Sequence, residues 1–403
     1  MSVTIERLGH LGDGIAAGPV FANMTLPGEV IEGEIVGDRI VAPKIITPSP
    51  DRVRALCRHF KSCGGCLMQH ASDDLVAQWK QDIVVTALTA QGLSTEFRPV
   101  DTSPSHSRRR AILSGRRTKK GSIVGFHGRG SDAIIEISEC HLLDPQLFAQ
   151  LEFLKELTVL GASRKGEVTF ILVQTLGGVD VAASNMRELD GPLRLELTAL
   201  GAKAGLARLC WNGEVIAEWH SAIQKFGKAK VNPPPGAFLQ ATLEGEVTLL
   251  RATQEAVGDA KRVVDLFSGC GTFSLPLANT AELHAVEGVS DMLNALSNGW
   301  RAAPGLKRVS TETRDLFRRP LTPDEFKSFD AVVIDPPRAG AEAQVTEIAQ
   351  STINRIAYVS CSPQTFARDA KILAEAGFKL DWVQVVDQFR WSNHVELAAC
   401  LTR

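Results

Sequence analysis

The sequence predicts an α/β protein in three parts, and two patterns carry that prediction. From Leu243 onward, helix-like and strand-like segments alternate with glycine turns between them, which is the order that forms a doubly wound parallel sheet. Residues 1–50 contain short strands interrupted at close intervals by glycine and proline, which is typical of a small β-barrel. Between these parts the chain alternates mainly like strands and predicts a mixed α+β central domain. We therefore divide the chain into residues 1–50, 51–240 and 241–403.

Composition limits the class of protein. With 403 residues, of which 44% are apolar and 22% charged, the chain resembles an ordinary globular protein large enough for several domains. Its formal net charge of −2 gives no overall attraction to nucleic acid, so any such binding needs a local basic patch. No apolar run reaches membrane length, and the opening MSVTIERLGH lacks the charged-then-apolar order of a signal peptide. We expect a cytoplasmic monomer with no membrane partner.

A cysteine cluster follows the predicted barrel. The stretch CRHFKSCGGCLMQH has the spacing C-x5-C-x2-C and supplies Cys57, Cys63 and Cys66. The Gly64-Gly65 pair allows the backbone to wrap round an inorganic core, and thiolates suit either an iron-sulfur cluster or zinc. His59 and His70 keep zinc open. Because a structural zinc site more often uses two separated cysteine pairs, the spacing favours iron-sulfur, with a fourth ligand from elsewhere in the chain.

The central part carries two predicted helices and one basic stretch. Helical spacing runs through Asp73–Gln91 and again near Pro145–Leu157. RRRAILSGRRTKKG concentrates basic side chains at Arg108, Arg109, Arg110, Arg116, Arg117, Lys119 and Lys120. AILSG interrupts this run as a hairpin would. The stretch is either a phosphate-binding face or a solvated one, and we favour binding.

The segment RVVDLFSGCGTFSLPLANTAELHAVEGV reads as strand, glycine turn, helix and strand. After the strand Val263–Phe267, Gly269 and Gly271 allow the backbone to approach a ligand closely. Glu287 ends the next strand, where a carboxylate can bind both hydroxyls of a ribose. Ser274 stands where a dinucleotide fingerprint has its third glycine, so S-adenosylmethionine is the better candidate ligand. A plain turn between strand and helix is the alternative.

Two further strand ends carry polar groups. FDAVVIDPPRAGA is a buried strand followed by a stiff proline loop, in which Asp335 can hold a cofactor amino group or a base edge and Arg338 can meet phosphate. In RIAYVSCSPQTFARD, the strand Ile356–Val359 precedes Cys361, and Pro363 suits the first turn of a helix. Ligands bind at this edge of a parallel sheet, and a helix N-terminus lowers the pKa of a nearby thiol. A small buried hydrophobe is the alternative reading of the cysteine.

These motifs resemble a known family. DLFSGCGTFSLPLA, DPPRAGA, YVSCSPQTFARD and the terminal HVELAACL are similar, in order, to the RNA 5-methyluridine methyltransferases. CRHFKSCGGCLMQH and GHLGDGIAAGPVF resemble the branch that has an iron-sulfur cluster and a TRAM domain. The resemblance implies a Rossmann-like S-adenosylmethionine methyltransferase domain at 241–403, a TRAM-like RNA-binding barrel at 1–50, and a central domain with a 4Fe-4S cluster and an RNA-binding surface.

The resemblance also implies roles for residues. Cys361 corresponds to the nucleophile and Glu396 of HVE to the base. The cluster ligands would be Cys57, Cys63, Cys66 and Cys140 of SECHLL. The methyl-donor site would be lined by Gln240, Phe267, Thr272, Glu287, Asp315 and Asp335. The target base and RNA would be contacted by Phe238, Arg338, Arg108, Arg109 and Arg110. The sequence departs from the family at FLQAT, which replaces FxQVN, and at Thr272 and Ser362, where asparagine is commoner.

The chemistry of uracil calls for the same two roles. Carbon 5 of uracil is a weak nucleophile, so a thiolate must first add to carbon 6, and a base must later remove the carbon 5 proton. A 5-methylcytidine enzyme needs a second cysteine after the proline of the DPPR loop, and none is present. The third hypothesis is an RNA-tethering or redox protein with an inert methyltransferase fold. We expect 23S rRNA as the substrate, with tRNA as the alternative.

Overall fold

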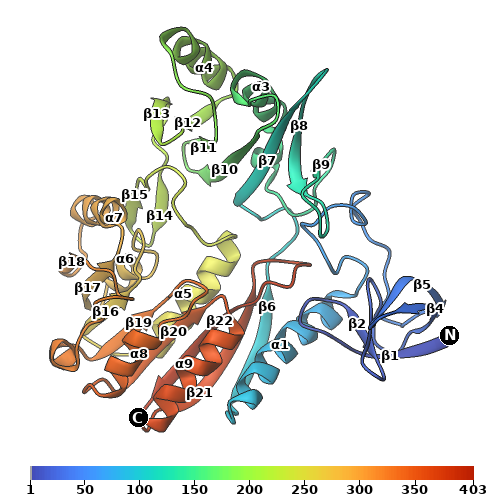
Figure 1. Ribbon diagram of the computed structural model, residues 1–403. Coiled ribbons are helices and arrows are strands. Elements are labelled where there is room, and N and C mark those ends of the chain that lie inside the picture. The colour runs from blue at the N-terminus through green and yellow to red at the C-terminus, as the bar shows by residue number, and fades with distance from the viewer. Residues whose placement is uncertain (1) are drawn as a thin grey trace.

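The computed structural model describes residues 2–403, and its first part is a closed β-barrel (Figure 1). The strand order is β1-β2-β3-β5-β4. The bounds are β1 (Ser2–Leu8), β2 (Gly14–Ala16), β3 (Val20–Ala22), β4 (Val30–Val36) and β5 (Arg39–Thr47). Ile5, Ile31 and Ile40 are buried in its centre, because alternate side chains of each strand point inward. The barrel predicted from the turn spacing is confirmed.

The cysteine loop (residues 51–72) connects the barrel to α1 (Asp73–Ala90). Ser72 caps this helix by accepting a hydrogen bond from the backbone N–H of Leu75 at 3.3 Å. Trp79 packs with Leu26 of the barrel region and donates its indole N–H to the carbonyl of Gly9. The helix predicted from spacing is confirmed, and it is the element against which the barrel rests.

The central sheet has the strand order β13-β12-β11-β10-β7-β8-β9. Its strands are β7 (Arg110–Thr118), β8 (Gly121–His127), β9 (Ile134–Glu136), β10 (Glu167–Thr175), β11 (Gly178–Ser184), β12 (Leu206–Trp211) and β13 (Glu214–Glu218). Its helices are α2 (Pro145–Phe148), α3 (Leu151–Gly161) and α4 (Gly191–Lys203). These helices bury Leu157 and Leu197 against Phe170 and Leu172 of the sheet.

The β7–β8 hairpin differs from the sequence expectation. AILSG lies inside β7, where Ala111 and Leu113 are buried, and the turn falls at Lys119 and Lys120. Alternation of small and apolar residues therefore makes this segment a strand, and the basic residues on either side of it lie at opposite ends of β7.

The C-terminal sheet has the order β18-β17-β16-β19-β20-β22-β21-β6, with β22 antiparallel to both of its neighbours and the other pairs parallel. Its strands are β6 (Glu96–Thr102), β16 (Arg262–Leu266), β17 (Glu282–Glu287), β18 (Val309–Thr313), β19 (Ala331–Ile334), β20 (Arg355–Ser360), β21 (Lys379–Asp387) and β22 (Glu396–Thr402). A separate hairpin is formed by β14 (Gln224–Phe226) and β15 (Ala229–Val231).

Helices cover both faces of this sheet. They are α5 (Leu243–Val257), α6 (Ser274–Leu277), α7 (Ser290–Ala302), the 3-10 helix η1 (Pro323–Ser328), α8 (Glu342–Ala349) and α9 (Pro363–Glu375). Leu249 of α5 and Leu296 of α7 pack on one face, whereas Val345 of α8, Phe366 of α9 and Val84 of α1 pack on the other. The doubly wound prediction is confirmed. Within residues 2–403, no helix is both long and apolar enough to cross a membrane.

The sheet draws strands from both sides of residue 241. The sequence division placed residues 96–102 in the central part, whereas β6 pairs in parallel with β21 at the edge of the C-terminal sheet. Figure 1 shows β6 and α1 lying beside α9 and β21, far in sequence from their neighbours. The chain therefore contributes to the C-terminal sheet before it builds the central one.

Candidate active site

The predicted site residues meet at the carboxyl edge of the C-terminal sheet. Glu287 ends β17, Asp335 follows β19 and Cys361 follows β20. Because β22 is antiparallel, it begins at this edge, and Glu396 is its first residue. Ser360 pairs with Leu397, so Cys361 and Glu396 extend the same register by one position. Residues far apart in sequence are thereby brought side by side.

The glycine turn after β16 has an unusual backbone. Phe267 has a φ of 61° and Gly271 a φ of 92°, both in the left-handed region, and a side chain at Gly271 would collide with Leu296. Glu287 fixes the turn, because its carboxylate accepts hydrogen bonds from the backbone N–H of Gly269 at 3.1 Å and of Val289 at 3.0 Å. The strand Val263–Phe267 of the prediction ends one residue earlier, which leaves Phe267 free to turn outward.

An aromatic pair lies next to this turn. The rings of Phe267 and Phe317 have their centroids 5.4 Å apart, and Phe317 is exposed. Asp315 caps the segment that carries Phe317 by accepting from its backbone N–H at 3.0 Å. Thr272 is half-buried directly after Gly271. These residues line one open side of the turn, which is where a flat aromatic ligand can pack.

Asp335 is half-buried and lies close to the buried carboxyls of Glu396 and Asp265. Gln240 approaches it, with 3.4 Å between Nε2 and an Asp335 carboxylate oxygen. Burial, and then the charges of Glu396 and Asp265, raise the pKa of Asp335 well above its usual value. Burial also raises the pKa of Asp265 to about 7, although Ser274 donates a hydrogen bond to it. Ionisation of these carboxyls is unfavourable at this edge of the sheet, and a positively charged ligand there would make it more favourable.

Glu396 is 3% exposed, and burial raises its pKa to about 7. Two groups oppose that shift: the amide of Gln388, which donates to a Glu396 carboxylate oxygen at 3.0 Å, and the positive charge of Arg338. A carboxyl with this pKa can exchange a proton near neutral pH, as a general base must. A lone glutamate on a strand is usually exposed to solvent at the edge of the sheet, whereas Glu396 is buried.

Cys361 is half-buried, and its thiol does not behave as the sequence indicated. The helix N-terminus was expected to lower its pKa, but burial and the negative charges of Glu396 and Asp335 raise it to about 11. Arg338 opposes the shift only in part. Glu396 and Asp335 lie in other segments of the chain, so the sequence around Cys361 could not indicate their effect on the thiol pKa.

Sequence reasoning missed Lys80 of α1. Its ammonium group is fully buried and donates to Asp387 at 2.5 Å and to the carbonyls of Phe389 and His394 at 3.0 and 2.9 Å. It thereby holds both ends of the β21–β22 loop (residues 388–395), which leads into Glu396. The available signal was a lysine on the apolar stripe of α1, four residues from Val76 and from Val84.

His394 lies in the β21–β22 loop, two residues before β22 begins at Glu396. Its Nδ1 is 2.8 Å from Nη2 of Arg338. Burial and the positive charges of Arg338, Arg108 and Lys80 lower the pKa of His394 to about 4. His394 is therefore neutral at physiological pH and orients Arg338 beside Cys361.

The three consecutive arginines have different surroundings. Arg110 lies over the ring of Phe238, 5.5 Å from its centroid, and Phe238 is 57% exposed. Arg108 lies 5.7 Å from the ring centroid of Phe389. Arg109 was expected to contact RNA, but it is buried, paired with Glu246 and bonded to the carbonyl of Gln240 at 3.2 Å. A guanidinium engaged in this way supports the Gln240 segment instead of a phosphate.

Four thiols face one small cavity between the cysteine loop and the segment after β9, namely those of Cys57, Cys63, Cys66 and Cys140. The backbone N–H of Gly65 donates to the Cys63 sulfur at 3.4 Å, and Gln69 donates to the Cys66 sulfur at 3.2 Å. Burial raises the pKa of each thiol, that of Cys66 to about 12. A side chain at Gly64 would come within 2.9 Å of the His127 carbonyl, which explains one glycine of the pair.

The two histidines that the sequence left open as zinc ligands are engaged in other contacts. His59 bonds Ser138, and His70 is buried against the ring of Phe60 with no hydrogen bond to either ring nitrogen. Within the part of the chain that the structure describes, no group of three or more histidine, cysteine or acidic side chains is arranged to hold a metal ion. The structure brings the thiols together but does not show the iron-sulfur cluster.

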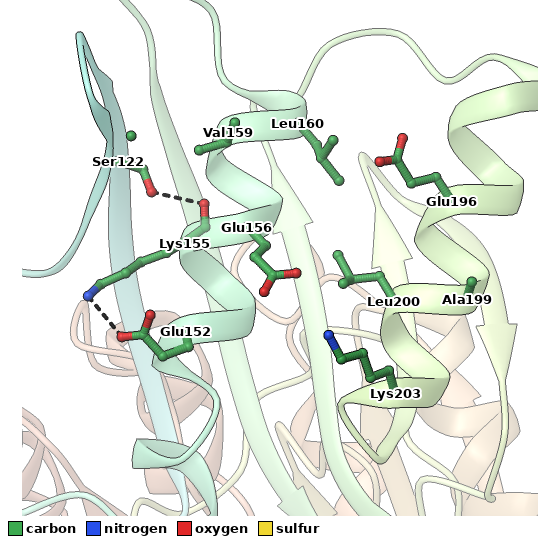
Figure 2. A pocket seen from close by; sticks show the side chains of 11 residues that line it. Ser122, Glu152, Lys155, Glu156, Val159, Leu160, Glu196, Ala199, Leu200 and Lys203 are labelled. Atoms are coloured by element: carbon green, nitrogen blue, oxygen red, sulfur yellow. Dashed lines mark hydrogen bonds and ion pairs between the residues drawn. The ribbon is translucent and has the colours of Figure 1, made fainter.

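A larger groove of about 710 Å³ lies on the other side of the molecule, between α3 and α4 (Figure 2). Leu160 and Leu200 face it, with Glu156, Glu196 and Lys203 around them. None of the predicted site residues lines this groove. It is therefore separate from the candidate active site.

Comparisons with known proteins identify the fold and the family. A family model described as tRNA (Uracil-5-)-methyltransferase matches residues 301–403. The solved structure of the Pyrococcus abyssi tRNA (uracil-54, C5)-methyltransferase in complex with S-adenosyl-L-homocysteine has a TM-score of 0.78 to this chain at 24% identity, covering 100% of this chain and 99% of that one. At this identity the likeness shows the fold.

Two relatives span the chain in sequence. An uncharacterized RNA methyltransferase of Brucella suis biovar 1 is 43% identical over 404 residues, which are 100% of this chain and 97% of the relative. The 23S rRNA (uracil(1939)-C(5))-methyltransferase of Chromohalobacter salexigens is 31% identical over 430 residues, which are 100% of this chain and 89% of the relative. The chain belongs to the RNA uracil-C5 methyltransferase family.

Proposed function

We propose that this enzyme methylates carbon 5 of one uridine in 23S rRNA, with Cys361 as the nucleophile and Glu396 as the base. The observation that carries the proposal is the register of β20 against β22. It sets the thiol and a carboxyl with a pKa of about 7 at adjacent positions, on the edge of the sheet that also carries the glycine turn. The nucleophile is needed in the first step of the reaction and the base in the last, and both side chains lie at the same edge of the sheet.

The reaction begins when the Cys361 thiolate adds to carbon 6 of uracil. The new carbon–sulfur bond pushes the electron pair of the 5,6 double bond towards the carbonyl at carbon 4, which gives carbon 5 enolate character. S-adenosylmethionine supplies a methyl group on a positively charged sulfur. Carbon 5 takes this methyl group, and S-adenosylhomocysteine leaves. Glu396 then takes the carbon 5 proton, the double bond re-forms, and the thiolate is released.

The raised pKa of Cys361 fits this order of events. Burial, and then the charges of Glu396 and Asp335, raise the pKa of the thiol to about 11, so it stays protonated in the free protein. A positive sulfonium group offsets those charges and makes the thiolate easier to form. The nucleophile is therefore activated chiefly when the methyl donor is bound, which protects the thiol from side reactions at other times.

The methyl donor would be held by residues of the sheet edge, namely Gln240, Phe267, Thr272, Glu287, Asp315 and Asp335. Phe267 and Phe317 offer an aromatic surface for adenine, and Glu287 offers a carboxylate at the strand end for the ribose. The excess of carboxyls supports a ligand that carries positive charge. The target uridine would be taken out of its stack and meet the exposed ring of Phe238.

RNA phosphates would be met by Arg108, Arg110 and Arg338, which surround the opening, and by the barrel. Arg109 is left out of this set because its charge is already paired. We favour 23S rRNA because the relative from Chromohalobacter salexigens, named for that substrate, matches the whole chain. A tRNA is the second candidate, because the matching family model describes tRNA methyltransferases.

A 4Fe-4S cluster would be held by Cys57, Cys63, Cys66 and Cys140. The fit rests on the donors: the four thiols share one cavity, and two N–H groups already point at two of the sulfurs. Each thiolate of such a cluster binds a different iron, so the four sulfurs need not converge on one point. The cluster would supply structural cross-linking of the cysteine loop to the central sheet.

The test uses undermodified 23S rRNA and tRNA transcripts, S-adenosylmethionine, denaturing gels and nucleoside mass spectrometry. Cys361→Ala should give no 5-methyluridine and no adduct. Glu396→Gln should transfer the methyl group and then accumulate a covalent protein–RNA adduct, because elimination has lost its base. Cys400→Ala, at a buried cysteine of the same sheet, is the matched control and should behave like the wild type.

Four outcomes would overturn parts of the proposal. Turnover of Glu396→Gln at the wild-type rate removes the glutamate from the mechanism, and an adduct in Cys361→Ala removes the cysteine. Methylation of tRNA but not of 23S rRNA reverses the choice of substrate. Failure of the wild type to methylate either RNA favours the tethering hypothesis over an active enzyme.

A further inference from the structure

Gln388 stands at the centre of the site, although no motif singled it out. It is the first residue of the β21–β22 loop, it is 2% exposed, and each polar atom of its side chain is bonded. Its Oε1 accepts from the backbone N–H of Ala241 at 2.8 Å. Its Nε2 donates to Oε1 of Gln240 at 2.5 Å and to Oε2 of Glu396 at 3.0 Å.

This arrangement fixes the orientation of the amide. A backbone N–H can only donate, so the atom that faces Ala241 must be the oxygen of Gln388. The NH2 group then has to face Gln240 and Glu396, and each of its two hydrogens has one acceptor. Glu396 therefore meets a donor whose direction is set by the backbone.

The same amide orients a second one. Because Gln388 donates to Oε1 of Gln240, the Nε2 of Gln240 is turned towards Asp335, 3.4 Å away. One side chain thus aligns the carboxyl that would act as base and the amide beside the expected methyl-donor residue. Both amides are buried, so no water competes for these bonds.

The fold keeps space for Gln388. Gly245 lies in the first turn of α5, and a side chain there would come within 2.7 Å of the Gln388 Cβ. Glycine inside a helix costs about 1 kcal/mol relative to alanine. The helix accepts that cost at the one place where a Cβ would push Gln388 off Glu396.

We propose that Gln388 is a positioning residue that keeps Glu396 ionised and reserves its other oxygen, Oε1, for the proton of carbon 5. This inference rests on the proposed role of Glu396 as the base. Among residues 2–403, Oε2 of Glu396 accepts the Gln388 amide and Oε1 receives no hydrogen bond. A proton on Oε2 would face an N–H group, so the incoming proton goes to Oε1.

The test is Gln388→Met, which keeps the length of the side chain and removes its hydrogen bonds. The matched control is Gln344→Met, because Gln344 is equally buried and bonds the backbone of Leu321 on the far side of the sheet. Loss of a hydrogen bond to a charged group should slow decay of the methylated adduct by roughly 10- to 100-fold. The control should leave the decay rate unchanged.

The pH profile separates positioning from simple loss of structure. Without its donor, Glu396 should ionise only at higher pH, so the rise of adduct decay with pH should move upward in Gln388→Met and the rate should recover in alkaline buffer. A fall by the same factor at every pH, or a profile equal to that of Gln344→Met, would contradict the inference.

A double variant distinguishes the positioning role of Gln388 from the proposed role of Glu396 as the base. If Gln388 acts through Glu396, adding Gln388→Met to Glu396→Gln should not slow decay further. Additive losses in the double variant would refute the positioning role even if each single variant is impaired. If Glu396→Gln itself turns over normally, the proposed function has failed at the base, whatever Gln388→Met does.

Discussion

At the scale of single residues, the role proposed for Glu396 as a base opposes its contribution to stability. The protein buries a carboxyl whose pKa rises to about 7, from an ordinary value of 4.5. The folded state therefore binds the proton more tightly than the unfolded state does. Stability from this group is fully present below pH 4.5 and is lost as the pH rises towards 7. At neutral pH, burial therefore disfavours the ionised form of Glu396 that the proposed role as a base requires.

Because folding raises the pKa of Glu396, we predict that Glu396→Gln is more stable than the wild type in mildly alkaline buffer. A neutral amide avoids the cost of a buried carboxylate, on the order of 2 kcal/mol. The gain should be largest above pH 7 and should vanish near pH 4, as measured by urea unfolding at each pH.

A contrasting variant is Glu325→Gln. Arg314 holds the pKa of Glu325 near 2, so its contribution is present above pH 4.5 and lost as the pH falls towards 2. This variant should be less stable than the wild type at pH 8. Equal destabilisation of both variants at pH 8 would refute the assignment for Glu396.

At the scale of elements, α1 acts as a support for the active site. Its Lys80 enters the space under the β21–β22 loop and bonds Asp387 and two carbonyls. The preceding residue, Trp79, packs against Leu26 of the barrel region. One helix therefore links the barrel to the loop that leads into Glu396.

Lys80→Met should destabilise the protein by about 3–5 kcal/mol, because Asp387 is left buried without its partner. Replacing both partners, as Lys80→Met with Asp387→Leu, should recover much of that loss. Lys155→Met is the control, since this lysine lies in a partly exposed ion pair with Glu136 and should change stability by less than about 1 kcal/mol. Unfolding in urea measures all three, and a Lys80→Met protein as stable as the control would contradict the supporting role.

Elements with a local signal were predictable, and those set by distant segments were not. Spacing gave α1 from Asp73, the strand before Cys361 and the helix from Pro363, since each depends on nearby residues. The pairing of β6 with β21 and the burial of Arg109 against Glu246 depend on segments more than one hundred residues away. Gln388 had one usable signal: like Asp335, it is a polar residue directly after the C-terminal end of a strand.

At the scale of the whole molecule, the cysteine loop contacts the β21–β22 loop. The backbone N–H groups of Leu67 and Met68 donate to the carbonyl of Trp391 at 2.6 and 3.0 Å, and Cys66 packs with Trp391. Arg129 ties the same loop to the central sheet by donating to the carbonyl of Cys66 at 2.7 Å. A change at the thiols can therefore reach the segment that precedes Glu396.

We expect protein purified without oxygen to contain about four iron and four sulfide per chain. Cys140→Ala should lose that iron and loosen the cysteine loop, because cluster binding and folding are coupled. Hydrogen exchange should then speed up in the cysteine loop and in residues 388–395. Cys210→Ala, at a buried cysteine of the central sheet, is the control and should keep its iron. Stoichiometric zinc in place of iron would overturn the cluster assignment.

The edge position of β6 has a consequence for synthesis on the ribosome. Its partner β21 is made about 280 residues later, which at ordinary translation rates is a wait of roughly 15–55 s. Throughout that interval the apolar stripe of α1 and one strand edge lack their native neighbours, and both are surfaces that chaperones recognise. The nascent chain can complete the C-terminal sheet only when β21 and β22 emerge, so a chain released by a ribosome stalled before them lacks part of the proposed active site.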